Sequence, residues 1–204
     1  MGKKTFAEEI REKKTRLIGI AGTSCGVGCT HFSIMLMNYL TGFLRRNAVL
    51  LEFNGSGDLE RLEYACTGHV GQKNPYRVLD ADYYKHAGPD ALEEVLQKSY
   101  DDILIDFGSV KDGDQTWYWR CEKKFLVGSF SEWQQECFRE FEMEKRTERK
   151  KCWQSLAAFG SEETRKEFLR RYRIHTERIP FSADAFVVTK ECGDFFARLL
   201  GDRI

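Results

Sequence analysis

Residues 18–36 of the 204-residue chain read IGIAGTSCGVGCTHFSIML, and this stretch decides the fold. Its apolar start predicts a buried strand, and the apolar residues spaced three and four apart after Thr30 predict a helix with one buried face. The three glycines between them, Gly22, Gly26 and Gly28, predict a tight turn. Such a turn directs backbone N–H groups to one point beside a helix N-terminus, and this arrangement suits a phosphate group.

Strands and helices are expected to alternate along the rest of the chain. Strands are predicted at residues 16–21, 48–53, 76–79, 103–105, 124–128, 153–159 and 174–180, and helices at 30–44, 89–98, 131–145, 161–172 and 190–200. This alternation predicts a single α/β domain with a mostly parallel sheet of about seven strands and helices on both faces. Residues 16–21 should lie at its centre beside residues 103–106. We expect residues 1–15 to form an N-terminal extension with a short polar helix, and residues 16–204 to form the domain.

Composition excludes several classes of protein. The 32 Lys and Arg residues balance 32 Asp and Glu residues, so attraction of the whole molecule to nucleic acid or anionic lipid is not expected. No apolar run is long enough for a transmembrane helix, and the charged N-terminus is not a secretory signal. Seven scattered cysteines indicate reduced thiols. We therefore expect a globular cytoplasmic protein with no membrane partner.

The glycine turn departs from the common P-loop pattern of Gly, four residues, then Gly-Lys-Ser/Thr. Here five residues separate Gly22 from Gly28, and Cys29 and Thr30 stand where Lys and Ser/Thr belong. The spacing is therefore one residue too long and the lysine is absent. Glycines in such a turn also allow a helix to pack closely on a strand, so a purely structural role is the alternative.

The turn is more similar to the variant P-loop of the MinD/ParA-like ATPases, whose motif reads Lys-Gly-Gly-x-Gly-Lys-Thr. Residues 24–30, SCGVGCT, are the corresponding stretch, with Gly26, Gly28 and Thr30 at the matching positions. In that family the second strand ends in Asp-x-Asp, and the corresponding residues here are Glu52 and Asn54.

Two later motifs extend the resemblance. The family's Walker B strand ends in Asp followed by Gly, and DDILIDFG places Asp106 and Gly108 there. An Ile-Pro-Phe before the last helices of the family is matched by residues 179–181. The resemblance therefore covers about residues 16–200, and it implies a P-loop NTPase-like fold.

The resemblance implies a site for ATP or ADP with Mg²⁺. Its residues would be Gly22, Ser24, Cys25, Gly26, Val27, Gly28, Cys29, Thr30, His31, Asn54 and Asp106. Thr30 would hold Mg²⁺, with Asp106 as its partner in the metal site.

The departures from the family pattern fall on the chemistry. Ser24 and Cys29 replace both lysines, and Asn54 replaces the aspartate that orients the attacking water. Phosphoryl transfer depends on positioning and charge neutralisation, and one lost charge-assisted contact costs about 1.5–3 kcal/mol. The resemblance thus implies a pseudo-ATPase with weak or no nucleotide binding and no catalytic residues, which acts as a localisation, assembly or regulatory factor.

This pseudo-ATPase would act through a protein partner or as a homodimer. It is most similar to the pilus-assembly members of the family, the TadZ/CpaE-like proteins. One alternative is an active ParA/MinD-type ATPase that takes its lysine from elsewhere, with Lys111 or Lys123 as the nearest choices.

Cys25, Cys29 and His31 could hold a metal or sense redox state, but their spacing resembles no common zinc pattern. A helix N-terminus should lower the pKa of Cys29 and make its thiol reactive. Small residues that fill a turn are the alternative explanation.

Other polar residues are expected to be ordinary surface groups. Asp101 and Asp102 precede a strand and should be solvated turn residues, and His69, His86 and His175 have no nucleophile motif beside them.

Two charged regions leave alternatives open. Residues 117–120, WYWR, followed by Lys123 and Lys124, could form a protein-contact surface, part of the core or a nucleic-acid platform. The basic clusters 145–151 and 165–173 fit either a solvated face or a nucleic-acid-binding module.

Overall fold

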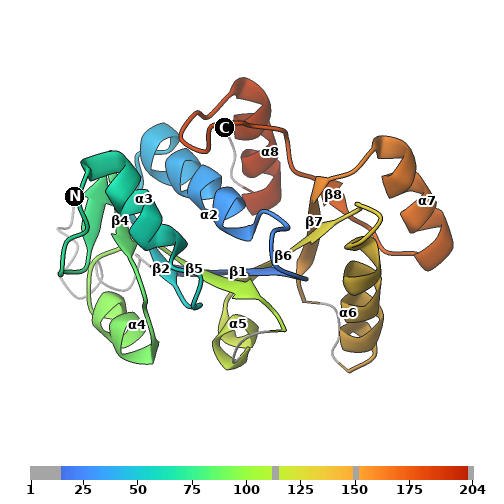
Figure 1. Ribbon diagram of the computed structural model, residues 1–204, viewed down its shortest axis with the longest axis horizontal. Coiled ribbons are helices and arrows are strands. Elements are labelled where there is room, and N and C mark those ends of the chain that lie inside the picture. The colour runs from blue at the N-terminus through green and yellow to red at the C-terminus, as the bar shows by residue number, and fades with distance from the viewer. Residues whose placement is uncertain (1–14, 112–114, 149–151, 202–204) are drawn as a thin grey trace, which may run out of the picture.

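The computed structural model describes residues 15–111, 115–148 and 152–201. In these residues eight strands form one sheet, in the order β3-β4-β2-β5-β1-β6-β7-β8, with helices on both faces (Figure 1). Neighbouring strands are parallel except β3 and β4, which form an antiparallel hairpin. The helix predicted within residues 1–15 lies outside the described residues.

The elements alternate as the sequence predicts. The strands are β1 (Arg16–Gly22), β2 (Ala48–Glu52), β3 (Tyr76–Val78), β4 (Ala81–Tyr84), β5 (Asp102–Ser109), β6 (Lys123–Ser129), β7 (Gln154–Phe159) and β8 (Glu177–Arg178). The helices are α2 (Cys29–Asn38), the π-helix η1 (Tyr39–Phe43), α3 (Asp58–Thr67), α4 (Pro89–Leu96), α5 (Thr116–Arg120), α6 (Gln135–Glu148), α7 (Glu162–Tyr172) and α8 (Lys190–Leu200). The α/β class and the mostly parallel sheet are confirmed, with eight strands rather than about seven.

Strand β1 lies between β5 and β6 near the middle of the sheet, as predicted. Ile18 and Ile20 of β1 face one core, whereas Ile103 and Ile105 of β5 face the core on the other side. These strands are apolar on both faces because helices cover both sides of a parallel sheet. Their carboxyl ends, together with that of β2, meet at one edge.

Helices form a layer on each side of the sheet. In Figure 1, α2, α3 and α8 lie above the sheet, and α4, α5 and α6 lie below it. Phe32 of α2 contacts Phe196 of α8 in the upper layer, with ring centroids 5.7 Å apart. Phe168 of α7 stacks on Phe138 of α6 at 5.4 Å, so α7 belongs to the lower core. In the described part of the chain, no helix has the length and apolar character needed to cross a bilayer.

The predicted helix 30–44 changes type before it ends. Its last turn is the π-helix η1, in which Leu44 N–H donates to Tyr39 O at 3.0 Å. A π-turn holds more residues than an α-turn, so later side chains rotate away from their α-helical positions. Phe43, predicted to face the core, is therefore 52% exposed.

Sequence patterning misses α3, β4 and α5. Helix α3 buries only Leu59 and Glu63, so it has little apolar periodicity, and α5 has only five residues. Two further predictions need correction. The helix predicted at 131–145 would place Trp133 on its inner face. Helix α6 begins at Gln135 instead, so Trp133 lies in the preceding turn and is 78% exposed. The strand predicted at 174–180 is only the two-residue β8.

Asp102 is not a solvated turn residue. Its side chain is completely buried at the start of β5, where Oδ1 accepts a hydrogen bond from Arg16 Nε at 2.6 Å. Arg46 Nε donates to Oδ2. Two arginines can partner one carboxylate here because Arg16 lies directly beside Asp102 in the parallel register. A short-range sequence pattern cannot detect this pairing.

Gly128 of β6 lies against a fully buried aromatic ring. A Cβ at this position would lie 2.5 Å from two atoms of the Phe138 ring, and Phe138 itself packs against Phe130 and Phe168. We expect Gly128→Ala to lower the free energy of unfolding by about 1–3 kcal/mol, as overpacking does in a close-packed core. Urea denaturation measures this change. Gly55→Ala is the control, because its Cβ would contact nothing within 4 Å; equal stability of the two variants would contradict the prediction.

Candidate functional site

A pocket of about 700 Å³ opens at the carboxyl ends of β1, β2 and β5. Parallel sheets place their ligands at this edge. The pocket is lined by Ser24, Cys25, Gly26, Gly28, Cys29, Thr30, His31, Phe53, Asn54, Gly55, Ser56, Asp58, Phe107, Gly108 and Ser109. Three other predicted site residues, Gly22, Val27 and Asp106, lie behind this surface. The structure therefore brings the predicted site residues together.

The glycine turn has the backbone that its sequence predicts. Gly26 and Gly28 have φ angles of +75° and +93°, at which a side chain would be strained. Gly28 is the N-cap of α2, and its carbonyl accepts from Phe32 N–H at 2.9 Å. The N–H groups of the first turn of a helix have no partner within the helix. Because Cys29 and Thr30 of this turn line the pocket, the end of α2 can receive an anion.

The turn is fixed to the core on its inner side. Val27 is 1% exposed, and a Cβ at Gly22 would lie 2.8 Å from Val27 Cγ2. Gly22 is therefore needed for this close approach. Thr23 N–H donates to Val127 O of β6 at 2.9 Å, which ties the start of the turn to the neighbouring strand.

Cys29, at the position of the second family lysine, turns inward. Its Sγ donates a hydrogen bond to Asp106 Oδ1 at 3.2 Å. Burial raises the pKa of the Cys29 thiol well above its ordinary value, and the nearby Asp106 carboxylate raises it further. The expectation that the helix N-terminus lowers this pKa is therefore wrong. The thiol stays protonated and is poorly placed for redox chemistry.

Asp106 lies behind the residues that line the pocket and is 1% exposed. Its Oδ1 also accepts from Gly108 N–H at 2.9 Å, and its Oδ2 has no hydrogen-bond partner within the described residues. Burial raises the pKa of Asp106, while the hydrogen bonds from Gly108 N–H and the Cys29 thiol oppose that rise. A buried carboxylate oxygen without a partner is suited to a cation or a bound water.

Asn54, at the position of the water-orienting aspartate, is occupied with the backbone. Its Nδ2 donates to Asp106 O at 3.1 Å, and its Oδ1 accepts from Ser56 N–H at 2.9 Å. Gly108 has a φ of +60° and lies so close that a Cβ there would be 2.9 Å from Asn54 Cβ. Asn54 therefore holds the ends of β2 and β5 together.

Thr30 lies opposite a carboxylate that sequence reasoning misses. Its Oγ1 donates to Oδ2 of Asp58, the first residue of α3, at 3.4 Å. Asp58 and Glu60 are acidic residues in the first turn of α3, and this composition is the signal that could have located the helix.

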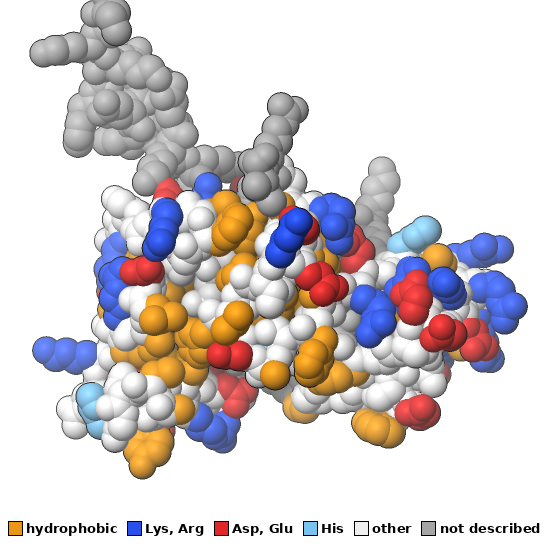
Figure 2. Space-filling view, turned by 90° about the horizontal axis from the view of Figure 1, so that it is seen from above, with side chains coloured by type: hydrophobic (Ala, Val, Ile, Leu, Met, Phe, Trp, Pro, Cys, Tyr) orange, Lys and Arg blue, Asp and Glu red, His pale blue; other side chains and the backbone are white. Residues whose placement is uncertain are grey.

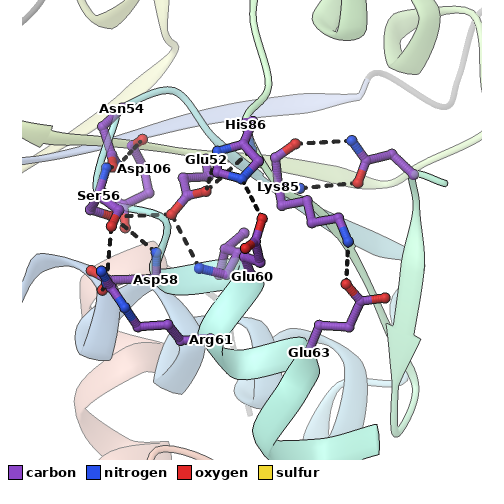
Figure 3. A network of polar contacts seen from close by, with 12 residues as sticks. Glu52, Asn54, Ser56, Asp58, Glu60, Arg61, Glu63, Lys85, His86 and Asp106 are labelled. Carbon is purple, nitrogen blue, oxygen red and sulfur yellow. Dashed lines mark hydrogen bonds and ion pairs between the residues drawn. The ribbon is translucent and has the colours of Figure 1, made fainter. Parts of the chain in front are cut away.

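Glu52 links the loop that lines the pocket to the start of α3 and to His86 (Figure 3). It is 1% exposed, and its Oε1 accepts from Ser56 Oγ at 3.0 Å and from Leu59 N–H at 3.1 Å. Its Oε2 accepts from His86 N–H at 3.2 Å. A carboxylate that receives N–H groups at a helix N-terminus stabilises that helix. Glu52 therefore positions the start of α3, including Asp58, at the pocket.

The residues that line the pocket include no lysine and no arginine. Both lysines considered as substitutes lie elsewhere: Lys111 Nζ donates to Cys137 Sγ at 3.4 Å, and Lys123 begins β6, at the opposite edge of the sheet. His31 lines the rim, where its Nε2 shares a hydrogen bond of 2.9 Å with Ser182 O. Any phosphate here would meet backbone N–H groups but no fixed positive side chain on the pocket wall.

The structure also bears on the metal alternative. Across the three described ranges, no group of three or more His, Cys, Asp and Glu side chains is placed to hold a metal ion. Cys25 is exposed, whereas Cys29 is buried against Asp106, so the two thiols do not converge on a shared ligand position.

The aromatic segment 117–120 is largely part of the core. Tyr118 is fully buried, and Trp119 packs edge-on against Trp153 at 5.8 Å. The Arg120 guanidinium lies 4.9 Å from the centroid of the Trp117 ring. Because two of the rings pack against other aromatic residues, these contacts favour packing over a nucleic-acid platform.

The basic clusters lie on a mixed charged surface. Arg165 Nη2 pairs with Glu162 at 2.6 Å, and Arg146 Nη1 donates to Arg173 O at 3.1 Å. Figure 2 shows acidic and basic side chains intermingled at the right-hand end of the molecule, where α7 lies in Figure 1. Part of cluster 145–151 falls outside the described residues. A nucleic-acid-binding role for these clusters stays a prediction.

No protein-family model matches the sequence, and no curated protein matches it. Solved structures share its fold. A plasmid partition protein of Borrelia burgdorferi, bound to AMPPNP, is 15% identical, with 93% of this chain and 98% of that chain covered and a TM-score of 0.69. The MinD cell division protein of Aquifex aeolicus is 15% identical, with 93% and 98% covered and a TM-score of 0.66.

A ParA family ATPase of Chlorobium tepidum is 14% identical, with 92% of this chain and 94% of that chain covered and a TM-score of 0.62. These matches extend over nearly the whole length of each protein. The chain therefore has the fold of the ParA and MinD ATPases.

Proposed function

We propose that the chain is a degenerate nucleotide-binding protein of this fold, a pseudo-ATPase that acts as a localisation, assembly or regulatory factor. The supporting observation is the composition of the pocket. It retains the glycine turn, Thr30 and the buried Asp106, but the residues that line it include no lysine and no arginine.

The absence of both lysines and of the water-orienting carboxylate should reduce ATP hydrolysis more than nucleotide binding. Backbone N–H groups at Gly26 and Gly28 can still contact phosphate, and Thr30, backed by Asp106, is suited to Mg²⁺. These residues support weak binding of ATP or ADP. Hydrolysis also needs a carboxylate to orient water and fixed cations to neutralise the developing charge. Asn54 cannot serve as that carboxylate, since both ends of its amide bind the backbone.

A protein that binds ATP without hydrolysing it acts by binding other molecules, such as a protein partner. The Aquifex aeolicus MinD is also solved in a complex with MinC. By analogy we propose a protein partner or a homodimer for this chain, in the cytoplasm. We further propose a role like that of the TadZ/CpaE-like pilus-assembly proteins.

We expect the purified protein to release phosphate from ATP no faster than buffer does. The physical reason is the absence of both lysines and of the water-orienting carboxylate. A phosphate-release assay with Mg²⁺ tests this, with Asp106→Ala as the comparison. Steady turnover that disappears in Asp106→Ala would show that the chain is an active ATPase.

A further inference from the structure

One arginine lies directly behind the pocket wall. Arg61, in the first turn of α3, donates from Nη1 to Ser56 O at 2.9 Å and to Asp58 Oδ1 at 2.7 Å. Both acceptor residues line the pocket. Figure 3 shows the Arg61 side chain turned back from α3 toward the loop that carries these two residues.

Only one carboxylate, that of Asp58, lies between Arg61 and Thr30 of the proposed phosphate site. Asp58 binds Arg61 through Oδ1 and accepts from the Thr30 hydroxyl through Oδ2 at 3.4 Å. The Arg61 side chain is 73% exposed, so its guanidinium can turn without disturbing the core. An exposed ion pair of this kind contributes little free energy, and a phosphate can therefore displace it.

We propose that Arg61 supplies the positive charge that the glycine turn lacks, by contacting the terminal phosphates of a bound nucleoside di- or triphosphate. This inference rests on the proposed function. A guanidinium offers several N–H donors in one plane, so it can bind two phosphate oxygens at once. The arginine would act from α3, on the opposite side of the pocket from Cys29.

Other cations are less suitably placed. Lys111 contacts Cys137, which does not line the pocket. His31 lies on the exposed rim and interacts with the Ser182 carbonyl. Arg61 differs from both because each of its two hydrogen-bond acceptors belongs to the pocket wall.

Calorimetric titration with Mg²⁺ and ATP, ADP or AMP tests the assignment. We expect Arg61→Gln to weaken ATP binding about ten- to a hundredfold, the effect of one charge-assisted contact. ADP should lose less affinity and AMP none, whereas a merely structural role would weaken all three equally. Arg61→Lys should recover part of the loss. Arg77→Gln is the matched control, because Arg77 is also an exposed arginine paired with an aspartate, 3.5 Å from Asp82.

A double variant separates direct contact from neutralisation of Asp58. If Arg61 only cancels the charge of Asp58, Arg61→Gln combined with Asp58→Asn should bind ATP as well as the parent. We expect the double variant to stay weak.

Three further results would overturn the assignment. If Arg61→Gln binds ATP as well as the parent, Arg61 does not supply the positive charge, and the proposed function is unaffected. If Lys111→Gln weakens ATP binding and Arg61→Gln does not, Lys111 has the role that we assign to Arg61. No binding of any nucleotide by the parent protein would refute both the assignment and nucleotide binding itself. Thermal melting checks that each variant is folded.

Discussion

Replacing Cys29 with lysine should strengthen nucleotide binding about ten- to a hundredfold, which corresponds to about 1.5–3 kcal/mol. The turn already has the backbone of a phosphate site, with Gly26 and Gly28 in left-handed conformations. Cys29 is the first residue of α2 and one of the residues that line the pocket. An ammonium at this position would reach the phosphates that the N–H groups of the turn bind. The gain should require Mg²⁺, because Thr30 is suited to hold it.

Titration of ATP and ADP with and without Mg²⁺ measures the gain, and Cys25→Lys is the control. Cys25 also lines the pocket, but its side chain is exposed, so a lysine there would remain in water where salt screens its charge. We expect little change in affinity from that variant. If Cys29→Lys folds normally and binds no better than the parent, the turn is not a phosphate site and its glycines serve packing alone.

The sequence was sufficient to predict the α/β class and the centre of the sheet. Both depend on long apolar strands and on one strongly periodic helix, α2, which are local patterns. It was not sufficient for α3, whose exposed face carries most of its residues, nor for the π-helix, which breaks the period at Phe43. These elements are fixed by tertiary contacts, among them the hydrogen bonds of Glu52 to the start of α3.

The sequence predicts where the candidate site lies, but it does not predict the side-chain contacts within the site. The residues of the turn, Asn54 and Asp106 do meet at one edge of the sheet, because parallel strands bring their carboxyl ends together. The inward turn of Cys29 toward Asp106 depends on a side-chain rotamer that no spacing encodes. Asp58 and Arg61 lie on an element that the sequence did not reveal, so the charges around the pocket could not be predicted from it.

At the amino end of β5, we expect Asp102→Ala to lower the free energy of unfolding by about 3–5 kcal/mol. This is the loss typical when one partner of a buried ion pair is removed. Asp102 is completely buried and binds Arg16 through one oxygen and Arg46 through the other. The Arg16 side chain is only 14% exposed, so the variant would take a carboxylate partner away from a largely buried positive charge. The effect should be at the low end of the range, because Arg46 is 35% exposed and can turn toward water.

Urea denaturation at low and high salt distinguishes this buried pair from a surface one. Screening weakens exposed ion pairs and acts much less on buried ones, so the loss in Asp102→Ala should persist in high salt. Asp101→Ala is the matched control: Asp101 is the preceding residue, and its Oδ2 accepts from Asn47 N–H at 2.9 Å in an exposed position. That variant should lose about 1 kcal/mol or less. If the two variants were equally stable, Asp102 would not anchor the start of β5, and the arginines beside it would be held by other contacts.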